Sequence, residues 1–552
     1  MKSIENDNAA KRINYVSEMY ENGIAGEKKR ILDAMTPEYA ALHRDGYIHI
    51  HDLEAYGKVY NCSIPDVIHD FPYGDFQLLS DHVKIFEIFN YYRDLIVNLA
   101  TEQTGGIGFC NFDGELDSIF CRLGIPYTDD LIQTSREVIR SFIKWINTNR
   151  TRYCREPYYL SFNLGLCTGT WGRKATDLFL NEFYGIPLHY TRPNIIFKVN
   201  EKINGSNNSP NHDLFQVALK CTAKRMIPTY LLTDSVVNKN INPLDIAIMG
   251  CRTRVHQNIN GEEMSLGRGN VAYVSLNLPR LALEAQNFED FYKRLETLMT
   301  SVARLLKDRM DRIIQDDGKY LYYVKTHRIW RENTSVRDML YNGTLSTGFI
   351  GLSEAVEVLT GKKPYQEENS LRMSYEIIQF MRRFVDSQRI RHHLNFSLLA
   401  TPGELLSGRF CEIDRGIFHH PVQEKEFYTK SFHVDVDSKI SIFEKIDIEA
   451  PFHSLCNGGC ISYIELGSAP LVNTLGLMDV VAYATQKGVS YLGFNYPLDI
   501  CNLCDSTGTF DVCPSCGSTE IKRIRRVSGY LEDYGYFTKG KKAETKMRKA
   551  NI

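Results

Sequence analysis

The sequence predicts an α/β protein, and three observations support this. Long amphipathic segments alternate with short runs rich in β-branched and aromatic residues. Gly and Pro are scattered as turn residues, and no internal repeat or low-complexity tract interrupts the pattern. Strands that alternate with long helices favour an open sheet or a barrel covered by helices.

Periodicity places the strongest elements. Helices are expected at 129–149, 212–226, 287–315 and 367–390. Strands are expected at 193–200, 270–278, 460–466 and 489–496. These elements reach almost to residue 500 without a change of composition, which indicates one large body.

Composition and charge exclude several classes of protein. The 552 residues are 43% hydrophobic and 24% charged, which is ordinary for a globular protein. With 65 Lys and Arg against 67 Asp and Glu, the net charge of -2 offers no basic surface for nucleic acid or membranes. No apolar run approaches the ~20 residues of a membrane-spanning helix, and the N-terminal stretch lacks an apolar signal core. We therefore expect a cytoplasmic protein.

The composition shifts once, near residue 500, where the chain becomes rich in Cys, Gly and Ser and then in Lys and Arg. We expect a large body over 1–498, a small cysteine module over 499–522 and a final loop and tail over 523–552.

The cysteine module has the spacing of a metal site. Cys501, Cys504, Cys513 and Cys516 form C-x2-C-x8-C-x2-C. Two such pairs place four thiolates at the corners of a tetrahedron, which suits a structural Zn²⁺ with no open coordination position. A redox role for one Cys-x-x-Cys is the alternative, and the second pair argues against it.

Gly529 follows this module in the sequence R-V-S-G-Y. By itself, a glycine between polar and aromatic residues is typical of a turn. Near the C-terminus and after a four-cysteine site, it resembles the glycyl radical loop of the anaerobic (class III) ribonucleotide reductases. The resemblance implies that Gly529 stores an unpaired electron, since a glycine Cα radical delocalises onto the flanking amide groups.

Further blocks resemble the same family, in order, from about residue 35 to 540. The blocks are IHIHDLEAYGKVYNCSI at 48–64, MGCRTRV at 249–255, GRGNVAYVSLNLPRLAL at 267–283, LATPGE at 399–404, YTKSFHV at 428–434 and NGGCISYIEL at 457–466. Together they make a chance resemblance implausible.

The resemblance implies a fold and several partners. The expected fold is a ten-stranded α/β barrel of two antiparallel halves, with the Cys251 loop through its centre and the Gly529 loop beside it. A closed barrel keeps radicals away from water. A separate radical S-adenosylmethionine enzyme is expected to install the glycyl radical, and the substrate is expected to be a ribonucleoside triphosphate.

The chemistry of the family assigns Cys251. Ribonucleotide reduction replaces a 2′-hydroxyl by hydrogen, and removal of the 3′-hydrogen first weakens the neighbouring C–O bond. The resemblance gives this abstraction to a thiyl radical at Cys251, in MGCRT, generated by Gly529. Without its motif, Cys251 would be interpreted as a buried apolar cysteine.

Four more residues receive expected roles from the resemblance. Cys62 lies on the opposite face of the sugar, where its thiol protonates the leaving hydroxyl and supplies an electron and a proton. Asn270 hydrogen-bonds a substrate hydroxyl or the external reductant, with a strand-entry role as the alternative. His51 orients the substrate or is structural, and Met249 packs against the substrate.

Cys456 and Cys460 flank N-G-G and depart from the family pattern. Family subgroups differ in using formate or a redoxin-type dithiol as reductant. Asn270 favours formate, whereas extra thiols near the site favour a dithiol route. Two packing cysteines beside a strand are the alternative, and the choice of reductant stays open.

A second departure concerns regulation. About 47 residues precede IHIHD, too few for the ATP-cone domain of larger relatives, so we expect no overall activity switch. The helical region before Cys167 is expected to form a homodimer and to hold a site for a dNTP effector.

Two other functions compete with this interpretation. Another glycyl radical enzyme, of the formate-lyase or decarboxylase type, is disfavoured because there is no adjacent Cys-Cys pair and those relatives lack the four-cysteine site. A zinc-ribbon binding protein would leave MGCRT, GRGN and RVSGY unexplained.

Overall fold

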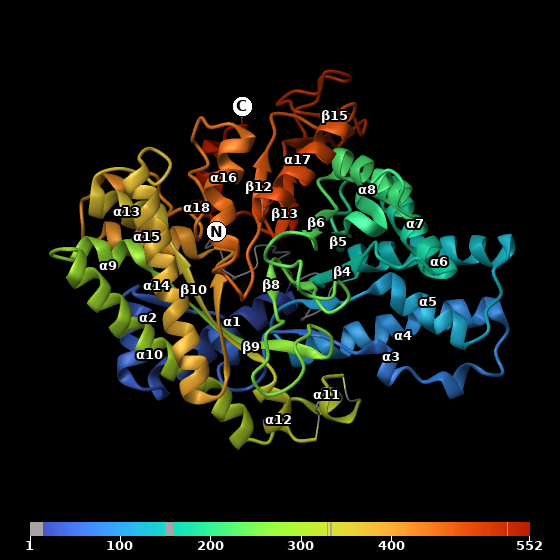
Figure 1. Cartoon of the computed structure of the whole chain (residues 1–552), viewed down its shortest axis with the longest axis horizontal. Helices are drawn as coiled ribbons and strands as arrows, with labels where there is room; N and C mark the ends of the chain where they lie inside the picture. The colour runs from blue at the N-terminus through green and yellow to red at the C-terminus, as the bar shows by residue number, and fades with distance from the viewer. Residues whose placement is uncertain are drawn as a thin grey trace.

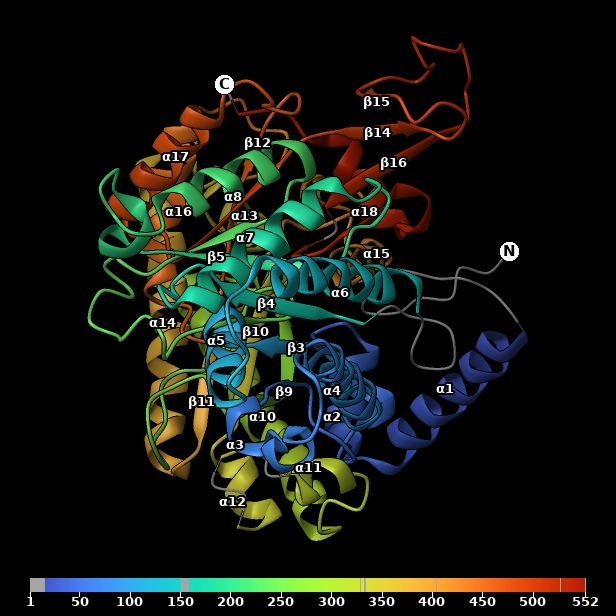
Figure 2. The same ribbon diagram turned by 90° about the vertical axis from the view of Figure 1, so that its right-hand side faces the viewer.

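The structure is a computed structural model that describes residues 15–149, 158–327, 329–331, 334–403, 405–526 and 528–551. Helices surround a central barrel of strands (Figures 1 and 2). The first half consists of β2 (Cys62–Ile64), β3 (Ile107–Phe109), β4 (Leu160–Leu164), β5 (Asn194–Val199) and β6 (Thr229–Leu232). The second half consists of β9 (Arg268–Asn277), β10 (Thr344–Ile350), β11 (Asn395–Ala400), β12 (Ser462–Glu465) and β13 (Tyr491–Asn495).

The two halves run antiparallel to each other, and strands within each half are parallel. β2 meets β9 with Cys62 opposite Asn270, and β6 meets β13 on the other side. A parallel bridge from Leu399 of β11 to Gly459, just before β12, closes the ring. Among the described residues, ten strands follow this path, which confirms the predicted ten-stranded α/β barrel; β1 (Ile48–Ile50) adds to β9 from outside it.

The barrel strands are buried on both faces. Helices cover the outside, and the loop that carries Cys251, residues 233–267 (the finger loop), fills the inside. All six residues of β5, NIIFKV, are buried. Parallel strands buried on both faces read as continuous apolar runs rather than as alternating ones. For this reason these strands could be predicted from apolar runs in the sequence.

The predicted elements are found within a few residues of their expected ends. The expected strands correspond to β5, β9, β12 and β13. The expected helices correspond to α6 (Asp129–Thr148), α8 (His212–Arg225), α10 (Phe288–Gln315) and α14 (Glu368–His392). Side-chain caps define several helix starts, as at α6, where Thr128 accepts a hydrogen bond from the Leu131 amide.

The finger loop connects the two halves and runs through the barrel. It carries the short hairpin of β7 (Ile248–Met249) and β8 (Thr253–Arg254), with Cys251 at the tip. Gly250 has φ +60°, a conformation that favours glycine. A Cβ at Gly106 would lie 2.8 Å from the Gly250 Cα, so the tip fits only because the residue before β3 is glycine.

The C-terminal segment forms a second, small sheet. Its order is β15 (Thr507–Gly508), β14 (Leu498–Cys501), β16 (Ile521–Arg526) and β17 (Leu531–Asp533). Gly529 lies in the loop between β16 and β17, and α18 (Lys539–Met547) then packs against α15 (Leu406–Arg415). The domain boundaries at 498 and 522 stay predictions.

The remaining helices complete the outer layer. They are α1 (Tyr15–Ala34), α2 (Pro37–Arg44), α3 (Val67–Asp70), α4 (Asp81–Glu102), α5 (Phe112–Arg122), α7 (Thr170–Gly185), α9 (Leu278–Glu284), α11 (Tyr322–Thr326), α12 (Val336–Tyr341), α13 (Leu352–Thr360), α16 (Ile442–His453) and α17 (Thr474–Lys487). Among the helices in the described ranges, none is long and apolar enough to span a bilayer.

Candidate active site

Gly529 lies directly against the backbone of Cys251, although the two residues are far apart in sequence. A Cβ at Gly529 would come within 2.5 Å of the Cys251 carbonyl oxygen and 2.8 Å of its carbonyl carbon. Real Cβ atoms do not approach backbone atoms so closely, so only a glycine fits here. The Gly529 Cα and the Cys251 residue are thereby brought together, as the sequence analysis expected.

A buried arginine holds the Gly529 loop. Arg526 is 1% exposed and donates a hydrogen bond to the Gly529 carbonyl oxygen at 2.8 Å and another to Asn495 Oδ1 at 2.6 Å. Tyr463 Oη donates to the Ser528 carbonyl oxygen at 2.5 Å. The loop is therefore fixed on both sides of the glycine Cα.

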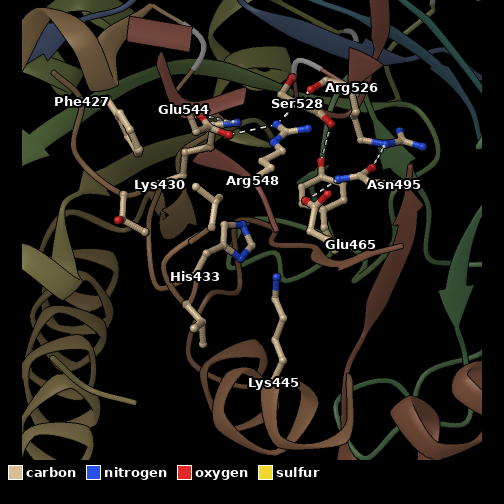
Figure 3. Close-up of a pocket in the computed structure, with 14 residues that line it drawn as sticks. Phe427, Lys430, His433, Lys445, Glu465, Asn495, Arg526, Ser528, Glu544 and Arg548 are labelled. Atoms are coloured by element: carbon tan, nitrogen blue, oxygen red, sulfur yellow. Dashed lines mark hydrogen bonds and ion pairs between the residues drawn. The ribbon is translucent and has the colours of Figure 1, made fainter. Parts of the chain in front are cut away.

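A second layer of charges lies behind this arginine, around a cavity of about 30 Å³ (Figure 3). Arg548 donates to the Arg526 carbonyl oxygen at 3.1 Å and to Glu544 Oε1 at 2.9 Å. Glu544 also pairs with Lys541 at 2.8 Å. The segment at the end of α18 is thus tied to the Gly529 loop by the hydrogen bond from Arg548, whose charge is paired with Glu544. Removal of one partner from such a buried ion pair is strongly destabilising.

The Cys251 thiol faces the same loop. Its Sγ lies 3.0 Å from Ser528 Oγ, and the side chain is half-buried. Because Ser528 precedes Gly529, the thiol contacts the loop that carries the glycine. This arrangement suits hydrogen transfer between a carbon and a sulfur.

Cys62 lies beside the tip of the finger loop. The Gly106 amide donates to Cys62 Sγ at 3.1 Å, and a Cβ at Gly250 would lie 3.9 Å from the same sulfur. Cys62 is 5% exposed. Cys62 is therefore buried beside Gly250, the residue that precedes Cys251.

Asn270 stands opposite Cys62 in the strand register and points into a polar patch of the barrel interior. Its Nδ2 donates to Thr344 Oγ1 at 2.8 Å and to Ser346 Oγ at 2.7 Å. Its buried Oδ1 has no hydrogen-bond partner among the described residues. An acceptor held in place in this way is available to a ligand.

His51 and Met249 are both buried, at different places. His51 Nε2 lies 2.9 Å from Ser275 Oγ, and its ring stacks on Tyr273 at 3.8 Å. Met249 is wholly buried in an apolar cluster that also contains Cys62. Their roles towards a substrate stay predictions.

Cys456 and Cys460 are buried beside the finger loop. Cys460 Sγ lies 3.2 Å from His453 Nδ1, and burial raises the pKa of this thiol to about 12. Burial also holds the pKa of Cys456 well above its usual range. Both thiols are therefore protonated near neutral pH.

Two residues of this site were missed in the sequence. Arg526 and Tyr530 lie at positions -3 and +1 from Gly529 and are both buried. For Arg526 a signal was present, because alternation along β16 puts it on the same face as the buried Ile524. For Tyr530 there was no signal beyond its place next to Gly529.

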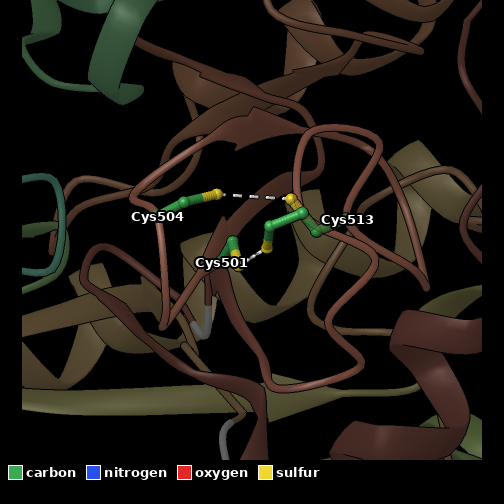
Figure 4. Close-up of side chains that lie close together, drawn as sticks. Cys501, Cys504 and Cys513 are labelled. Atoms are coloured by element: carbon green, nitrogen blue, oxygen red, sulfur yellow. Dashed lines mark hydrogen bonds between the residues drawn. The ribbon is translucent and has the colours of Figure 1, made fainter.

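The four cysteines of the C-terminal module converge (Figure 4). Their sulfur atoms all lie within 4.8 Å of one another, with Cys501 and Cys516 at 3.5 Å and Cys504 and Cys513 at 3.5 Å. Four thiolates around Zn²⁺ at ~2.3 Å have S–S separations of about 3.8 Å. The residues present fit a tetrahedral metal such as zinc, and all four corners are occupied by protein.

Zinc is expected to support the Gly529 loop, because β16 connects the cysteines to Gly529 and pairs with β14 at Cys501 and Ile521. We expect about one zinc per chain, reduced to near zero by Cys504→Ser, together with a loss of radical formation. Elemental analysis and electron paramagnetic resonance measure the two effects. Cys121→Ser, at an exposed cysteine of α5, is the control and should change neither. Iron in place of zinc, or no metal, would contradict the prediction.

Comparison with known proteins decides the family. A family model described as anaerobic ribonucleoside-triphosphate reductase matches residues 5–550. The chain belongs to the anaerobic ribonucleoside-triphosphate reductase family. It is 31% identical to the Escherichia coli K12 member over 563 residues, which covers 92% of this chain and 77% of that one. It is 29% identical to the phage T4 member over 568 residues, with 91% and 89% covered.

Solved structures of this family share the fold. An anaerobic ribonucleotide reductase superposes with a TM-score of 0.76 at 15% identity, over 97% of this chain and 90% of that one. The Thermotoga maritima reductase in complex with dATP and CTP gives 0.73 at 16% identity, over 97% and 92%. The chain is therefore an oxidoreductase of this family, an anaerobic ribonucleoside-triphosphate reductase, on the barrel fold predicted for it.

Proposed function

We propose that Gly529 stores the radical, that Cys251 carries it to the substrate as a thiyl, and that Cys62 and Asn270 complete the reduction. The single observation that carries this proposal is the contact of Gly529 with Cys251, where a Cβ would fall 2.5 Å from the Cys251 carbonyl oxygen. Hydrogen transfer needs such an approach, since effective catalysis requires the reacting atoms to be held in place.

The proposed steps give each of these residues a role. The glycyl radical takes the hydrogen of Cys251, and the thiyl takes the 3′-hydrogen of the ribose. Cys62 gives its proton to the 2′-hydroxyl, the C2′–O bond breaks and water leaves. The Cys62 thiolate then supplies one electron, which forms the C2′–H bond with the proton of the 3′-hydroxyl and leaves a thiyl at Cys62. Formate gives its hydrogen atom to this thiyl and its second electron to the 3′-ketone, and it leaves as carbon dioxide. A proton from solvent completes the C3′ radical, and Cys251 returns its hydrogen to C3′. Asn270 Oδ1, buried and without a partner among the described residues, accepts a hydrogen bond from a substrate hydroxyl or holds the reductant.

The burial of Gly529 supports the need for a separate activating enzyme. Gly529 is packed on Cys251, and its neighbours Ser528 and Tyr530 are buried. A radical S-adenosylmethionine enzyme cannot reach the Cα in this position. We propose that the segment from β16 to α18 leaves the barrel for activation and then docks again.

The reductant is proposed to be formate. Cys456 and Cys460 are 2% exposed, and the raised pKa of both thiols disfavours thiolate exchange with a redoxin. Asn270, by contrast, has a free acceptor in the interior. A dithiol reductant is the second candidate, favoured only by the closeness of the loop before β12 to the finger loop, where the Arg254 amide donates to the Gly458 carbonyl oxygen at 2.9 Å.

Nucleotide binding is proposed at an open cavity of about 840 Å³ beyond the ends of β2, β3 and β4. Cavities of this size accommodate ligands as large as nucleotides, and ligands of α/β folds gather at the carboxyl ends of strands. Arg122 and Arg331 line it and can face phosphate groups. The homodimer and the dNTP effector stay predictions.

One assay tests the proposal. The activated protein is incubated anaerobically with a ribonucleoside triphosphate and either formate or a thioredoxin system. We expect one carbon dioxide from formate for each deoxyribonucleotide. Turnover with the thioredoxin system alone would show that the reductant is a dithiol and not formate. A glycyl signal without reduction of any ribonucleotide would contradict the proposed steps, and the absence of any signal would contradict radical storage at Gly529.

A further inference from the structure

Tyr530 directly follows Gly529, and its side chain is turned into the barrel. It is 7% exposed, and its ring centroid lies 5.0 Å from that of Tyr159. Its hydroxyl has no hydrogen-bond partner among the described residues. Buried polar groups are nearly always hydrogen-bonded, so this exception calls for a ligand that the protein alone does not supply.

The hydroxyl faces the same side of the finger loop as Cys62. A Cβ at Gly250 would lie 3.7 Å from Tyr530 Oη and 3.9 Å from Cys62 Sγ. Tyr530 Oη and Cys62 Sγ therefore both lie within 4 Å of one point beside Gly250, and they do not hydrogen-bond to each other. A hydroxyl oxygen that accepts from both would need a gap of roughly 6 Å. Because Gly250 has no side chain, no Cβ occupies the point that lies within 4 Å of both atoms.

The electrostatics keep Tyr530 a donor. Burial is the largest effect and holds its pKa well above the usual range, and negative charge at Cys251 or Cys62 raises it further. The nearby Ser161 side chain has the opposite effect and lowers the pKa of Tyr530. The Ser161 hydroxyl already donates to the Gly250 carbonyl oxygen at 3.0 Å. The phenol therefore keeps its proton and can offer it in a hydrogen bond.

We propose that Tyr530 is a catalytic residue whose hydroxyl donates a hydrogen bond to the ribose 2′-oxygen while Cys62 donates to the same oxygen. The inference rests on the proposed function and adds a residue to it. Cys62 transfers its proton, the C2′–O bond breaks and the oxygen leaves as water. Tyr530 keeps its proton throughout and stabilises the charge that moves between sulfur and oxygen. Its hydrogen bond is worth most at that moment, when the enclosed site excludes water.

Tyr530→Phe tests this role, since it removes one oxygen and keeps the ring against Tyr159. We expect a normal glycyl signal, a kcat lowered about 100-fold and a nearly unchanged KM for the nucleotide. The decisive arm uses a 2′-chloro-2′-deoxyribonucleoside triphosphate, whose chloride leaves without a proton. Its chloride release should be as fast in Tyr530→Phe as in the unaltered protein. Tyr530→His, which keeps a donor, should recover part of the kcat.

Tyr536→Phe is the matched control, since Tyr536 is 47% exposed and should tolerate the change. Equal losses with both substrates would reduce Tyr530 to a packing residue and overturn the inference. No loss with the ribonucleotide, or a loss of the glycyl signal, would overturn it too. If the unaltered activated protein reduces no ribonucleotide, the proposed function is wrong and the inference falls with it.

Discussion

Gly529→Ala is expected to reduce turnover to that of the unactivated protein. Two effects act together. Alanine adds a methyl group where the Cys251 carbonyl oxygen lies 2.5 Å away, and backbone atoms cannot yield as a flexible side chain can. The added carbon also hinders the planar geometry in which a Cα radical delocalises over its amide groups. No positive φ is involved, so the requirement for glycine at this position is one of space and of C–H chemistry.

The measurement is electron paramagnetic resonance after incubation with the activating enzyme. The unaltered protein should show a glycyl doublet, and exposure to air should then cut the chain at Gly529. Gly535→Ala is the matched control, because a Cβ there meets only Asp533 Oδ1 at an ordinary 3.4 Å. It should keep both the doublet and the turnover. Normal activation of Gly529→Ala would remove the glycine from the mechanism.

The sequence predicted most of the fold because its elements are strongly periodic. The helix expected at 287–315 is α10 (Phe288–Gln315), since Asn287 caps it and its apolar stripe is continuous. Closure of the barrel was different. It depends on the bridge from Leu399 to Gly459 and on Gly459 at φ +118°, neither of which leaves a local pattern. Only the family resemblance implied a closed ring.

In the site, too, local features could be predicted from the sequence, whereas contacts between distant segments could not. The spacing of the four cysteines predicted their convergence, because all of them lie on one short segment. The contact between Gly529 and Cys251 joins distant segments, and spacing could not predict it. Arg526 looked like one of several surface cations of β16, although it is 1% exposed. A buried arginine is visible only once its carbonyl partners are in place.

Cys251→Ser and Cys62→Ser are expected to abolish reduction in two distinguishable ways. Cys251→Ser should still accept a radical at Gly529, because activation concerns only the glycine and the activating enzyme. The serine O–H bond is too strong for the glycyl radical to break. The glycyl signal should therefore persist when substrate is added, and no product should form.

Cys62 acts later, after the 3′-hydrogen has been removed. Cys62→Ser should therefore start the reaction, fail to complete it, and lose its glycyl signal when substrate is added. Serine is a poorer acid than a thiol and cannot supply the electron that follows the proton. Since serine is nearly isosteric with cysteine, the affinity for the nucleotide should be equal in the two variants.

The two thiols have different neighbours in the structure. Cys251 Sγ faces Ser528 Oγ at 3.0 Å, whereas Cys62 Sγ accepts from the Gly106 amide at 3.1 Å. Cys110→Ser is the matched control, since this buried thiol belongs to the cluster around Cys62 and already donates to the Leu244 carbonyl oxygen. It should turn over normally. The reverse pattern of signals would mean that the two roles are exchanged, and turnover by either variant would exclude that cysteine from the reaction.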